Sequence, residues 1–377
     1  MKAETSFSLK DQLFNKDKVA YLAGLIKDAH PKFSKAKFQK DVLAKFPELA
    51  LKERITHIAE CLKAYLPKSY PKSLDILLEA LPEELDPTKT DDDFGDFIFA
   101  PLSYFVAAYG CQKKYLASSL QGLKAMTKRF SAEYAIRFFI NEFPDETFDF
   151  LVECATDENY HVRRWASEGT RPKLPWAQKL VTDWERPLQI LDLLYTDSTR
   201  FVTRSVANHL NDISKIDPDT VVETLERWKG SGEQADKEMG FITRHSLRTL
   251  EKKGHQGALS VLGFGDEPDV TLSHFETSTP EVPVGTAFEF GLTITANQTQ
   301  SLLIDYHMEF ASDSKRVSKK VFKLKKLTLE AGKSIKIKKK HPMKLMTTRR
   351  LVLGKHTITL QINGQPFDSL SFELVEA

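Results

Sequence analysis

The sequence contains little that would support a secreted, membrane-bound or disulfide-linked protein. Cys61, Cys111 and Cys154 are its only cysteines, and no two of them form a C-x-x-C pair, so neither a disulfide framework nor a zinc ribbon is indicated. No stretch approaches the roughly 18 uninterrupted apolar residues of a membrane span, and the N-terminus lacks the apolar segment of a secretory signal. We therefore expect a folded cytoplasmic protein with buried thiols and no membrane contact.

Motifs of common catalytic sites are also absent. There is no H-E-x-x-H pair for zinc and no nucleophile elbow, and Gly263-Phe264-Gly265 is too short for a dinucleotide-binding loop. The acidic turn at residues 91–96 lacks the twelve-residue pattern of a calcium loop. Capping of a helix that begins near Asp96 explains this turn better than metal binding does. The sequence thus indicates neither a metal nor a cofactor.

The charge of the chain is small in total but unevenly distributed. The formal net charge is +2. Residues 268–377 hold 16 Lys and Arg against 11 Asp and Glu, which leaves 38 of the 54 basic and 41 of the 52 acidic residues in the first 267 positions. A cationic segment attached to a near-neutral one suggests a polyanionic partner.

One motif recurs three times at a constant interval of 40 residues. Its copies are Val162-Arg163-Arg164, Val202-Thr203-Arg204 and Ile242-Thr243-Arg244. This interval is typical of α-solenoids of the HEAT and armadillo kind, in which helical hairpins of roughly 40–47 residues stack and bury their apolar faces against one another. The repeated arginine either bridges adjacent repeats or contributes to a positively charged concave wall, and the sequence leaves both possibilities open.

The segment that follows the first copy, residues 162–176, combines a helix end with a carboxylate. Apolar side chains at i, i+3 and i+4 from Val162 predict a helix, and Gly169 predicts its end. Glu168 would then lie in the last turn, where the helix dipole disfavours a negative charge. Arg164 lies one turn earlier on the same face and could compensate that charge.

This segment resembles the HEAT-like-repeat alkylpurine DNA glycosylases of the AlkC type, which carry the run V-R-R-x-A-S-E-G-x-R-P-x-L-P-W. Residues 133–137 also match that family, although by themselves they indicate only a helix start, with Ser131 as the N-cap and Glu133 in the first turn. The third match, residues 208–212, could otherwise be an ordinary polar helix end. The resemblance covers residues 10–265.

The resemblance implies a reaction as well as a fold. It implies a monofunctional enzyme that hydrolyses the N-glycosidic bond of cationic alkylated bases, such as 3-methyladenine and 3-methylcytosine, in double-stranded DNA; we expect this enzyme to be a monomer. No cofactor is implied, and no pocket that encloses a flipped base. A carboxylate suits this chemistry because positive charge develops on the sugar as the base departs. Carried over to this sequence, the catalytic residues are Glu168, Glu133 and Asp212.

From Pro268 onward the pattern changes to alternating apolar and polar residues separated by turn residues. Six or seven such segments between residues 268 and 377 are typical of an antiparallel sandwich, and the resemblance implies that it is immunoglobulin-like. Lysines at positions 336 and 338–340, with those at positions 323, 325 and 326, would form a basic outer face. That face is either simply solvated or in contact with nucleic-acid phosphates, and we favour phosphate contact.

We therefore predict a multidomain α-then-β protein, with an α-solenoid of HEAT-like repeats followed by an antiparallel Ig-like β-sandwich. Residues 1–266 would form the glycosylase domain, with irregular helices up to residue 100 and regular repeats from residue 101. Residues 267–377 would form the basic sandwich. The expected DNA-binding side chains are Arg163, Arg164, Trp176, Arg204, Asn208, Arg244, His245, Lys336, Lys338, Lys339 and Lys340.

Two other functions remain open at this point. A HEAT array is often a non-catalytic adaptor, and an inactive protein that binds damaged DNA would share most of the same features. An adaptor has no need for Glu133, Glu168 and Asp212 to converge with Trp176 on one face. The positions of these side chains therefore distinguish the alternatives.

Overall fold

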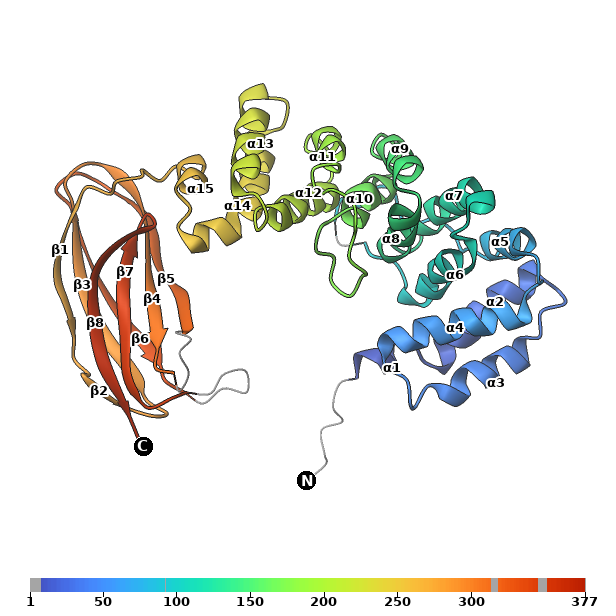
Figure 1. Cartoon of the computed structure of the whole chain (residues 1–377), viewed down its shortest axis with the longest axis horizontal. Coiled ribbons are helices and arrows are strands. Elements are labelled where there is room, and N and C mark those ends of the chain that lie inside the picture. The colour runs from blue at the N-terminus through green and yellow to red at the C-terminus, as the bar shows by residue number, and fades with distance from the viewer. Residues whose placement is uncertain (1–7, 92, 313–317, 345–350, 377) are drawn as a thin grey trace. The chain divides into compact units, whose positions relative to one another are not determined.

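The computed structural model describes residues 8–91, 93–312, 318–344 and 351–376 (Figure 1). Helices come first along the chain and strands follow, as the sequence predicts. The helices before the central motif are α1 (Leu9–Leu13), α2 (Lys16–Ala29), α3 (Lys35–Lys45), α4 (Leu51–Tyr65), α5 (Tyr70–Glu79), α6 (Ala100–Gly110), α7 (Leu116–Thr127), α8 (Glu133–Glu142) and α9 (Pro144–Cys154), with the short 3-10 helices η1 (Phe97–Phe99) and η2 (Lys113–Tyr115).

Each copy of the motif that recurs every 40 residues lies in a helix. The helices from the first copy onward are α10 (Tyr160–Gly169), α11 (Leu188–Leu194), α12 (Arg200–Ile213), α13 (Pro218–Ser231), α14 (Asp236–Lys253) and α15 (Gln256–Val261). The three copies fall in α10, α12 and α14. Helix α10 packs against α8, α9 and α12, so side chains from α8, α10 and α12 can meet at one place.

Local sequence explains the position of α10. Asn159 caps its start, since the side-chain oxygen accepts a backbone N–H of the first turn at 2.9 Å. Trp165 is fully buried beneath the helix. The helix ends at Gly169, which confirms the prediction and leaves Glu168 in the last turn. A Cβ atom on Gly169 would lie 2.5 Å from Cγ2 of Ile136, so a glycine is needed for α10 to approach α8 this closely.

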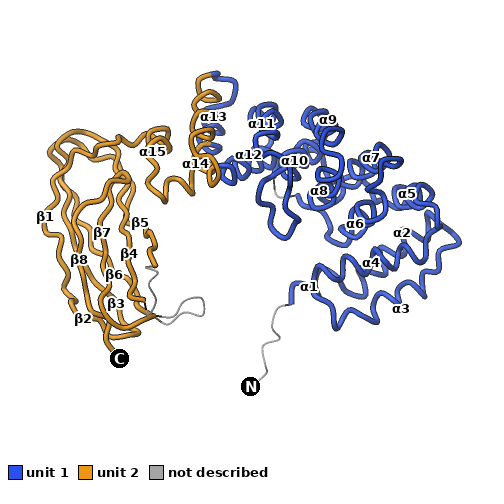
Figure 2. The backbone as a smooth tube through the Cα atoms, in the orientation of Figure 1, with its two compact units in different colours: residues 1–213, 231–242 blue, residues 214–230, 243–377 orange. Residues whose placement is uncertain are grey.

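Contacts within the chain define two compact units (Figure 2). The first unit comprises Met1–Ile213 with Ser231–Ile242, and the second comprises Ser214–Gly230 with Thr243–Ala377. The first unit contains α1 to α12, and the second contains most of α13 and α14 together with α15 and the strands. The strands begin at Val270, and a domain boundary at residue 266 stays a prediction.

The strands form two sheets, which confirms the predicted change from helix to sandwich. The three-stranded sheet has the order β1-β3-β6 and the five-stranded sheet the order β2-β8-β7-β4-β5. Their bounds are β1 (Val270–Thr277), β2 (Glu281–Pro283), β3 (Ala287–Ala296), β4 (Gln300–Phe310), β5 (Ser318–Leu329), β6 (Ser334–Pro342), β7 (Gly354–Ile362) and β8 (Gln365–Val375).

The sandwich differs from the prediction in two details. The described residues form eight strands rather than six or seven, and the short β2 pairs with β8 in parallel, whereas the other strand pairs are antiparallel. The core between the sheets follows the expected alternation, because every second residue of β3, from Phe288 to Ala296, is buried. These apolar faces hold the two sheets together.

Two further observations concern the described ranges as a whole. No helix within them is both long and apolar enough to cross a membrane. They also hold no group of three or more His, Cys, Asp and Glu side chains placed to bind a metal ion. Cys61 and Cys154 are buried, Cys111 is half-buried, and all three are free thiols.

Candidate active site

Five charged side chains from three helices and one loop form a chain of alternating sign. Arg164 Nη1 lies 3.0 Å from Glu133 Oε2, and Arg164 Nη2 lies 3.9 Å from Glu168 Oε2. Arg171 Nη1 donates to Glu168 Oε1 at 2.6 Å, and Arg171 Nη2 lies 2.9 Å from Asp212 Oδ2. The three acids that the sequence selects are thus brought together, with an arginine between each pair.

Most of this chain is removed from solvent. Arg164, Glu168, Arg171 and Asp212 are all buried, and only the Glu133 side chain, which is 26% exposed, reaches solvent to a larger extent. Charges buried in this way are stable only when they are paired and hydrogen-bonded. Each of the five has at least one partner of opposite charge within 3.0 Å.

The start of α8 sets the position of Glu133. The N-cap is Ala132 rather than the predicted Ser131, and the helix begins at Glu133 itself. The Ser131 hydroxyl contacts Glu133 Oε2 directly and accepts a hydrogen bond from Arg164 Nη1 at 2.9 Å. Ser131 therefore fixes the carboxylate and the guanidinium rather than the helix backbone.

Glu168 is held ionised by its neighbours. Burial by itself would raise the pKa of this carboxyl group, but the charges of Arg164 and Arg171 and the hydrogen bonds from Ser205 and Arg171 outweigh it, so the pKa lies below its usual value. Ser205 Oγ, on α12, donates to Glu168 Oε2 at 2.6 Å. The unfavourable position of Glu168 at the helix end is therefore compensated by two arginines, whereas the sequence suggested only Arg164.

Arg171 is a site residue that the sequence analysis missed. It lies just beyond the end of α10 and joins Glu168 to Asp212, which comes from α12. A signal was available, since Arg171 follows Glu168 by three residues and is part of the matched run. Helical spacing does not predict the contact, however, because Arg171 lies outside the helix.

Arg137 on α8 holds the loop that carries Arg171. Its guanidinium donates to three backbone carbonyls of that loop, those of Gly169 at 3.1 Å, Arg171 at 2.7 Å and Gln178 at 2.7 Å. Burial, together with the nearby charge of Arg171, lowers the pKa of Arg137 to about 10, so it is still a cation at neutral pH. Asn141, one turn later, donates to the carbonyl of Lys179 at 3.0 Å.

The charged chain opens into a cavity of about 320 Å³. Six of the predicted side chains line it, namely Glu133, Arg164, Glu168, Trp176, Arg204 and Asn208, together with the unpredicted Arg171 and Ser205. Asp212 is not among the lining residues, and its carboxylate instead binds Arg171 from behind. Glu168 and Glu133 can therefore face a bound molecule directly, while Asp212 can act on it only through Arg171.

Trp176 stands at the edge of this cavity in an unusual backbone conformation. Trp176 is 63% exposed, and its φ of 65° lies in the left-handed region that non-glycine residues rarely occupy. The Lys52 ammonium, on α4, donates to its carbonyl oxygen. A large exposed aromatic held in this way suggests a role in binding.

The predicted arginines differ in what they contact. Arg163, although next to Arg164, pairs with Asp197 of the following repeat and donates to the carbonyls of Asp157 and Glu158 at 2.9 Å. It therefore bridges adjacent repeats. Arg204 pairs with Asp91 and also lines the cavity.

The remaining predicted residues belong to the second compact unit. On α14, Arg244 is exposed and His245 is half-buried. On β6, Lys336, Lys338 and Lys340 are exposed and share one face, as the alternation of a strand requires. Lys339 is directed to the opposite face and is half-buried. The other predicted lysines, Lys323, Lys325 and Lys326, lie on β5 in the five-stranded sheet, so the expected single basic face is wrong for these four residues.

The chain is similar to known proteins over nearly all of its length. Residues 119–250 match the DNA alkylation repair enzyme family, and residues 271–376 match the C-terminal Ig-like domain of the uncharacterised protein YhaZ. Protein YhaZ of Bacillus subtilis (strain 168) is 30% identical over 367 residues, which are 96% of this chain and 98% of that protein.

A solved structure extends this similarity to three dimensions. It is that of Pseudomonas fluorescens alkylpurine DNA glycosylase AlkC bound to DNA containing an abasic site analog. The TM-score is 0.83 at 32% sequence identity, and the match covers 98% of this chain and 100% of that one. Both the helical array and the Ig-like sandwich predicted from the sequence therefore have a counterpart in one protein.

Proposed function

The chain belongs to the AlkC family of alkylpurine DNA glycosylases, and from this premise we propose that it hydrolyses the N-glycosidic bond of cationic alkylated bases in double-stranded DNA. The reaction breaks the bond between C1′ of the sugar and the base nitrogen. The electron pair of that bond stays with the base, so a base that was cationic in the DNA leaves as a neutral molecule. Water then bonds to C1′ and loses a proton to the solvent.

The observation that carries this proposal is the ionised Glu168 in the wall of the cavity. Its pKa lies below the usual value although the side chain is buried, so it is a carboxylate throughout the neutral range. A fixed negative charge that is buried in protein stabilises the positive charge that develops on the sugar far better than the same charge does in water. No strong general acid is needed, because the cationic base leaves readily.

The other side chains have supporting roles in this proposal. Glu133 lines the same cavity and assists Glu168, whereas Asp212 assists indirectly by holding Arg171. Arg204 and Asn208, also in the cavity wall, would contact the DNA backbone, and Trp176 would pack against the exposed nucleotide.

We further propose that the enzyme is monofunctional, using water rather than an amine. Strand cleavage by a bifunctional glycosylase requires an amine that forms a Schiff base with the sugar. Among the described residues that line the cavity there is no lysine. The ammonium of Lys52, on α4, is directed to the Trp176 carbonyl.

For the second part of the chain, we propose that residues 267–377 form a basic domain that contacts DNA outside the reaction site. The exposed Lys336, Lys338 and Lys340 support this proposal, because they present three positive charges on one face of β6. The Lys340 ammonium lies 2.7 Å from the Glu289 carboxylate, which reduces the contribution of Lys340 to DNA binding. The domain would add phosphate contacts without reading the base sequence.

The test is the release of methylated base from alkylated DNA by the purified protein. The Glu168→Gln variant keeps the size of the side chain and removes its charge, and we expect a single-turnover rate lower by roughly 10²–10³-fold with DNA binding retained. Glu158→Gln is the matched control, since it removes an exposed carboxylate just before α10, and its rate should equal that of the wild type.

Two results would favour the other functions. If wild type and Glu168→Gln bind DNA equally well and neither releases base, the protein is a damage-binding protein rather than an enzyme. If the wild type neither releases base nor binds DNA, the array is an adaptor. Equal activity of the two forms would remove Glu168 from the mechanism.

A further inference from the structure

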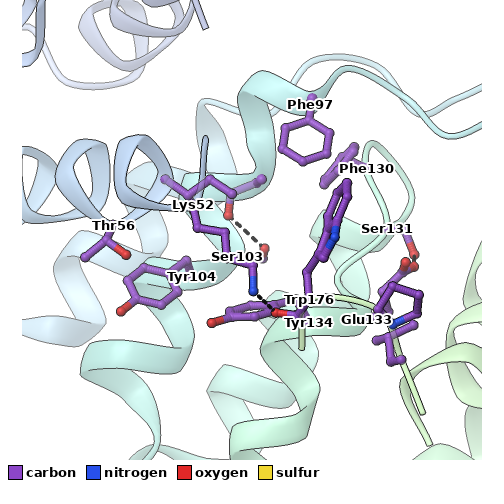
Figure 3. Close-up of a pocket in the computed structure, with 14 residues that line it drawn as sticks. Lys52, Thr56, Phe97, Ser103, Tyr104, Phe130, Ser131, Glu133, Tyr134 and Trp176 are labelled. Atoms are coloured by element: carbon purple, nitrogen blue, oxygen red, sulfur yellow. Dashed lines mark hydrogen bonds between the residues drawn. The ribbon is translucent and has the colours of Figure 1, made fainter. Parts of the chain in front are cut away.

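A second cavity adjoins the proposed reaction site. Its volume is about 180 Å³, and it is walled by the rings of Phe97, Tyr104, Phe130, Tyr134 and Trp176 (Figure 3). These rings come from η1, α6, α8, the turn before α8 and the loop after α10. Of the residues that line it, only Glu133 and Trp176 have a role in the proposed reaction.

The two cavities share one wall. Glu133, Leu174, Pro175 and Trp176 line both of them. Glu168 and Arg171 line only the first cavity, so the second is not the place where the bond is broken. It is separated from that place by the Trp176 loop and the Glu133 side chain.

The shared wall is fixed in position from both sides. The Glu133 carboxylate is held by Arg164 and Ser131. On the far side, Lys52 of α4 binds the Trp176 carbonyl, and Figure 3 shows its ammonium directed toward that oxygen. The pocket therefore keeps its shape without an occupant, as binding sites for small ligands commonly do.

The chemistry of the walls identifies the kind of molecule that would fit. Aromatic rings favour a flat aromatic ligand by stacking, and this preference does not depend on which nucleobase the ligand is. The hydroxyl groups of Thr56 and Ser103 and the carboxylate of Glu133 add hydrogen-bonding groups for ring nitrogens and an exocyclic amino group. Apolar cavities of about 150 Å³ hold a benzene-sized molecule, so this pocket can admit a slightly larger flat heterocycle.

We infer that this pocket binds the free alkylated purine after its release. The inference rests on the proposed function, which produces a neutral, planar base directly beside the shared wall. The base stays outside the pocket while it is attached to DNA and enters it only once the bond to C1′ is broken. Occupancy of the pocket then slows the release of product and makes the free base an inhibitor.

The experiment uses the full chain without DNA and titrates it with 3-methyladenine by calorimetry. Wild type should bind the base, and Tyr104→Leu should bind it roughly 5- to 150-fold more weakly, as expected for the loss of one stacking partner. Tyr109→Leu is the matched control, because Tyr109 is also a half-buried tyrosine of α6 but does not line the pocket. It should bind the base as the wild type does.

A second variant separates this inference from the proposed function. Glu168→Gln should bind free 3-methyladenine with wild-type affinity, because Glu168 lies outside the pocket, even though it no longer cleaves. In the cleavage assay, added 3-methyladenine should inhibit the wild type and inhibit Tyr104→Leu much less. Melting temperatures of the variants show that each one is folded.

Two results would overturn the inference. The first is no binding of 3-methyladenine by the wild type at millimolar concentration, whether or not the enzyme is active. The second is equal binding by Tyr104→Leu and wild type, which would put the base elsewhere. If the first result is accompanied by weaker binding of Tyr104→Leu to abasic-site DNA, the pocket belongs to a nucleotide of the duplex.

Discussion

Replacement of Arg171 by methionine tests whether the alternating chain of charges is required for both stability and activity. Methionine fills part of the same space but cannot pair with a carboxylate. The structure shows that Glu168 would lose a contact of 2.6 Å and Asp212 would lose contacts of 2.9 and 3.0 Å. Both carboxylates are buried, so neither can recover its hydration.

The magnitude of the loss follows from this geometry. Removal of one partner from a buried ion pair destabilises a protein by about 3–5 kcal/mol. For a folded unit of this size, each kcal/mol lowers the melting temperature by roughly 2–4 °C, so Arg171→Met should melt about 6–20 °C below the wild type. Circular dichroism of the helical signal measures this shift.

A double variant shows whether the loss comes from the pairing. Asp212→Asn alone should also destabilise, because it leaves part of the Arg171 charge uncompensated. The double variant Arg171→Met/Asp212→Asn should lose less than the sum of the single effects, with a coupling of about 0.5–3 kcal/mol. Strict additivity would refute the pairing.

Activity supplies an independent readout of the same contact. In wild type, the guanidinium groups of Arg164 and Arg171 oppose the effect of burial, which raises the pKa of Glu168. Arg171→Met removes one of these two groups, so the pKa of Glu168 should rise. The cleavage rate of Arg171→Met should therefore fall as the pH is lowered from 7 toward 5, because the carboxylate becomes protonated. The wild-type rate should not respond to Glu168 in this range, since the pKa of Glu168 lies below 4.5. Parallel pH profiles would refute the reasoning.

Two further predictions concern pH and salt. Burial lowers the pKa of His161 and of His209 from 6.5 to about 4. Between pH 6.5 and pH 4 the unfolded chain therefore binds more protons than the folded chain. The stability that the two neutral histidines contribute is complete above pH 6.5 and is lost progressively as the pH falls from 6.5 to 4. At pH 5 each histidine should cost about 2 kcal/mol, and urea unfolding at pH 7.5 and 5 should show a difference that His209→Gln reduces by about half. Replacement of Lys336, Lys338 and Lys340 by glutamine should lower the slope of log affinity for DNA against log salt by up to about 0.9 per lost phosphate contact; an unchanged slope would mean that these lysines only solvate the strand.

Local features of the sequence were enough to predict the change from helices to strands and the position of several elements, although the described residues form eight strands where six or seven were predicted. The end of α10 at Gly169 is determined by residues within one turn of it, and the alternation in β3 is determined by the two-residue period of a strand. The constant spacing of the motif was enough to predict that its three copies occupy equivalent helices, and each copy does lie in a helix. Such features depend on near neighbours in the chain, which a sequence displays directly.

The site itself depended on contacts that the sequence does not display. The resemblance was enough to select Glu133, Glu168 and Asp212. Two contacts, however, follow from the packing of α10 against α12: Arg171 joins Glu168 to Asp212, and Ser205 donates to Glu168. Arg163 and Arg164 are adjacent in sequence, yet the first bridges to Asp197 and the second faces the cavity, because successive residues of a helix point in directions about 100° apart. Sequence determined which groups are present and where helices end. The local pairing of Arg164 with Glu168 could be predicted from helical spacing, whereas the tertiary structure decided that Arg164 also pairs with Glu133 and that Arg171 pairs with Asp212, because those pairs bring together side chains far apart in the chain in a medium that tolerates no unpaired charge.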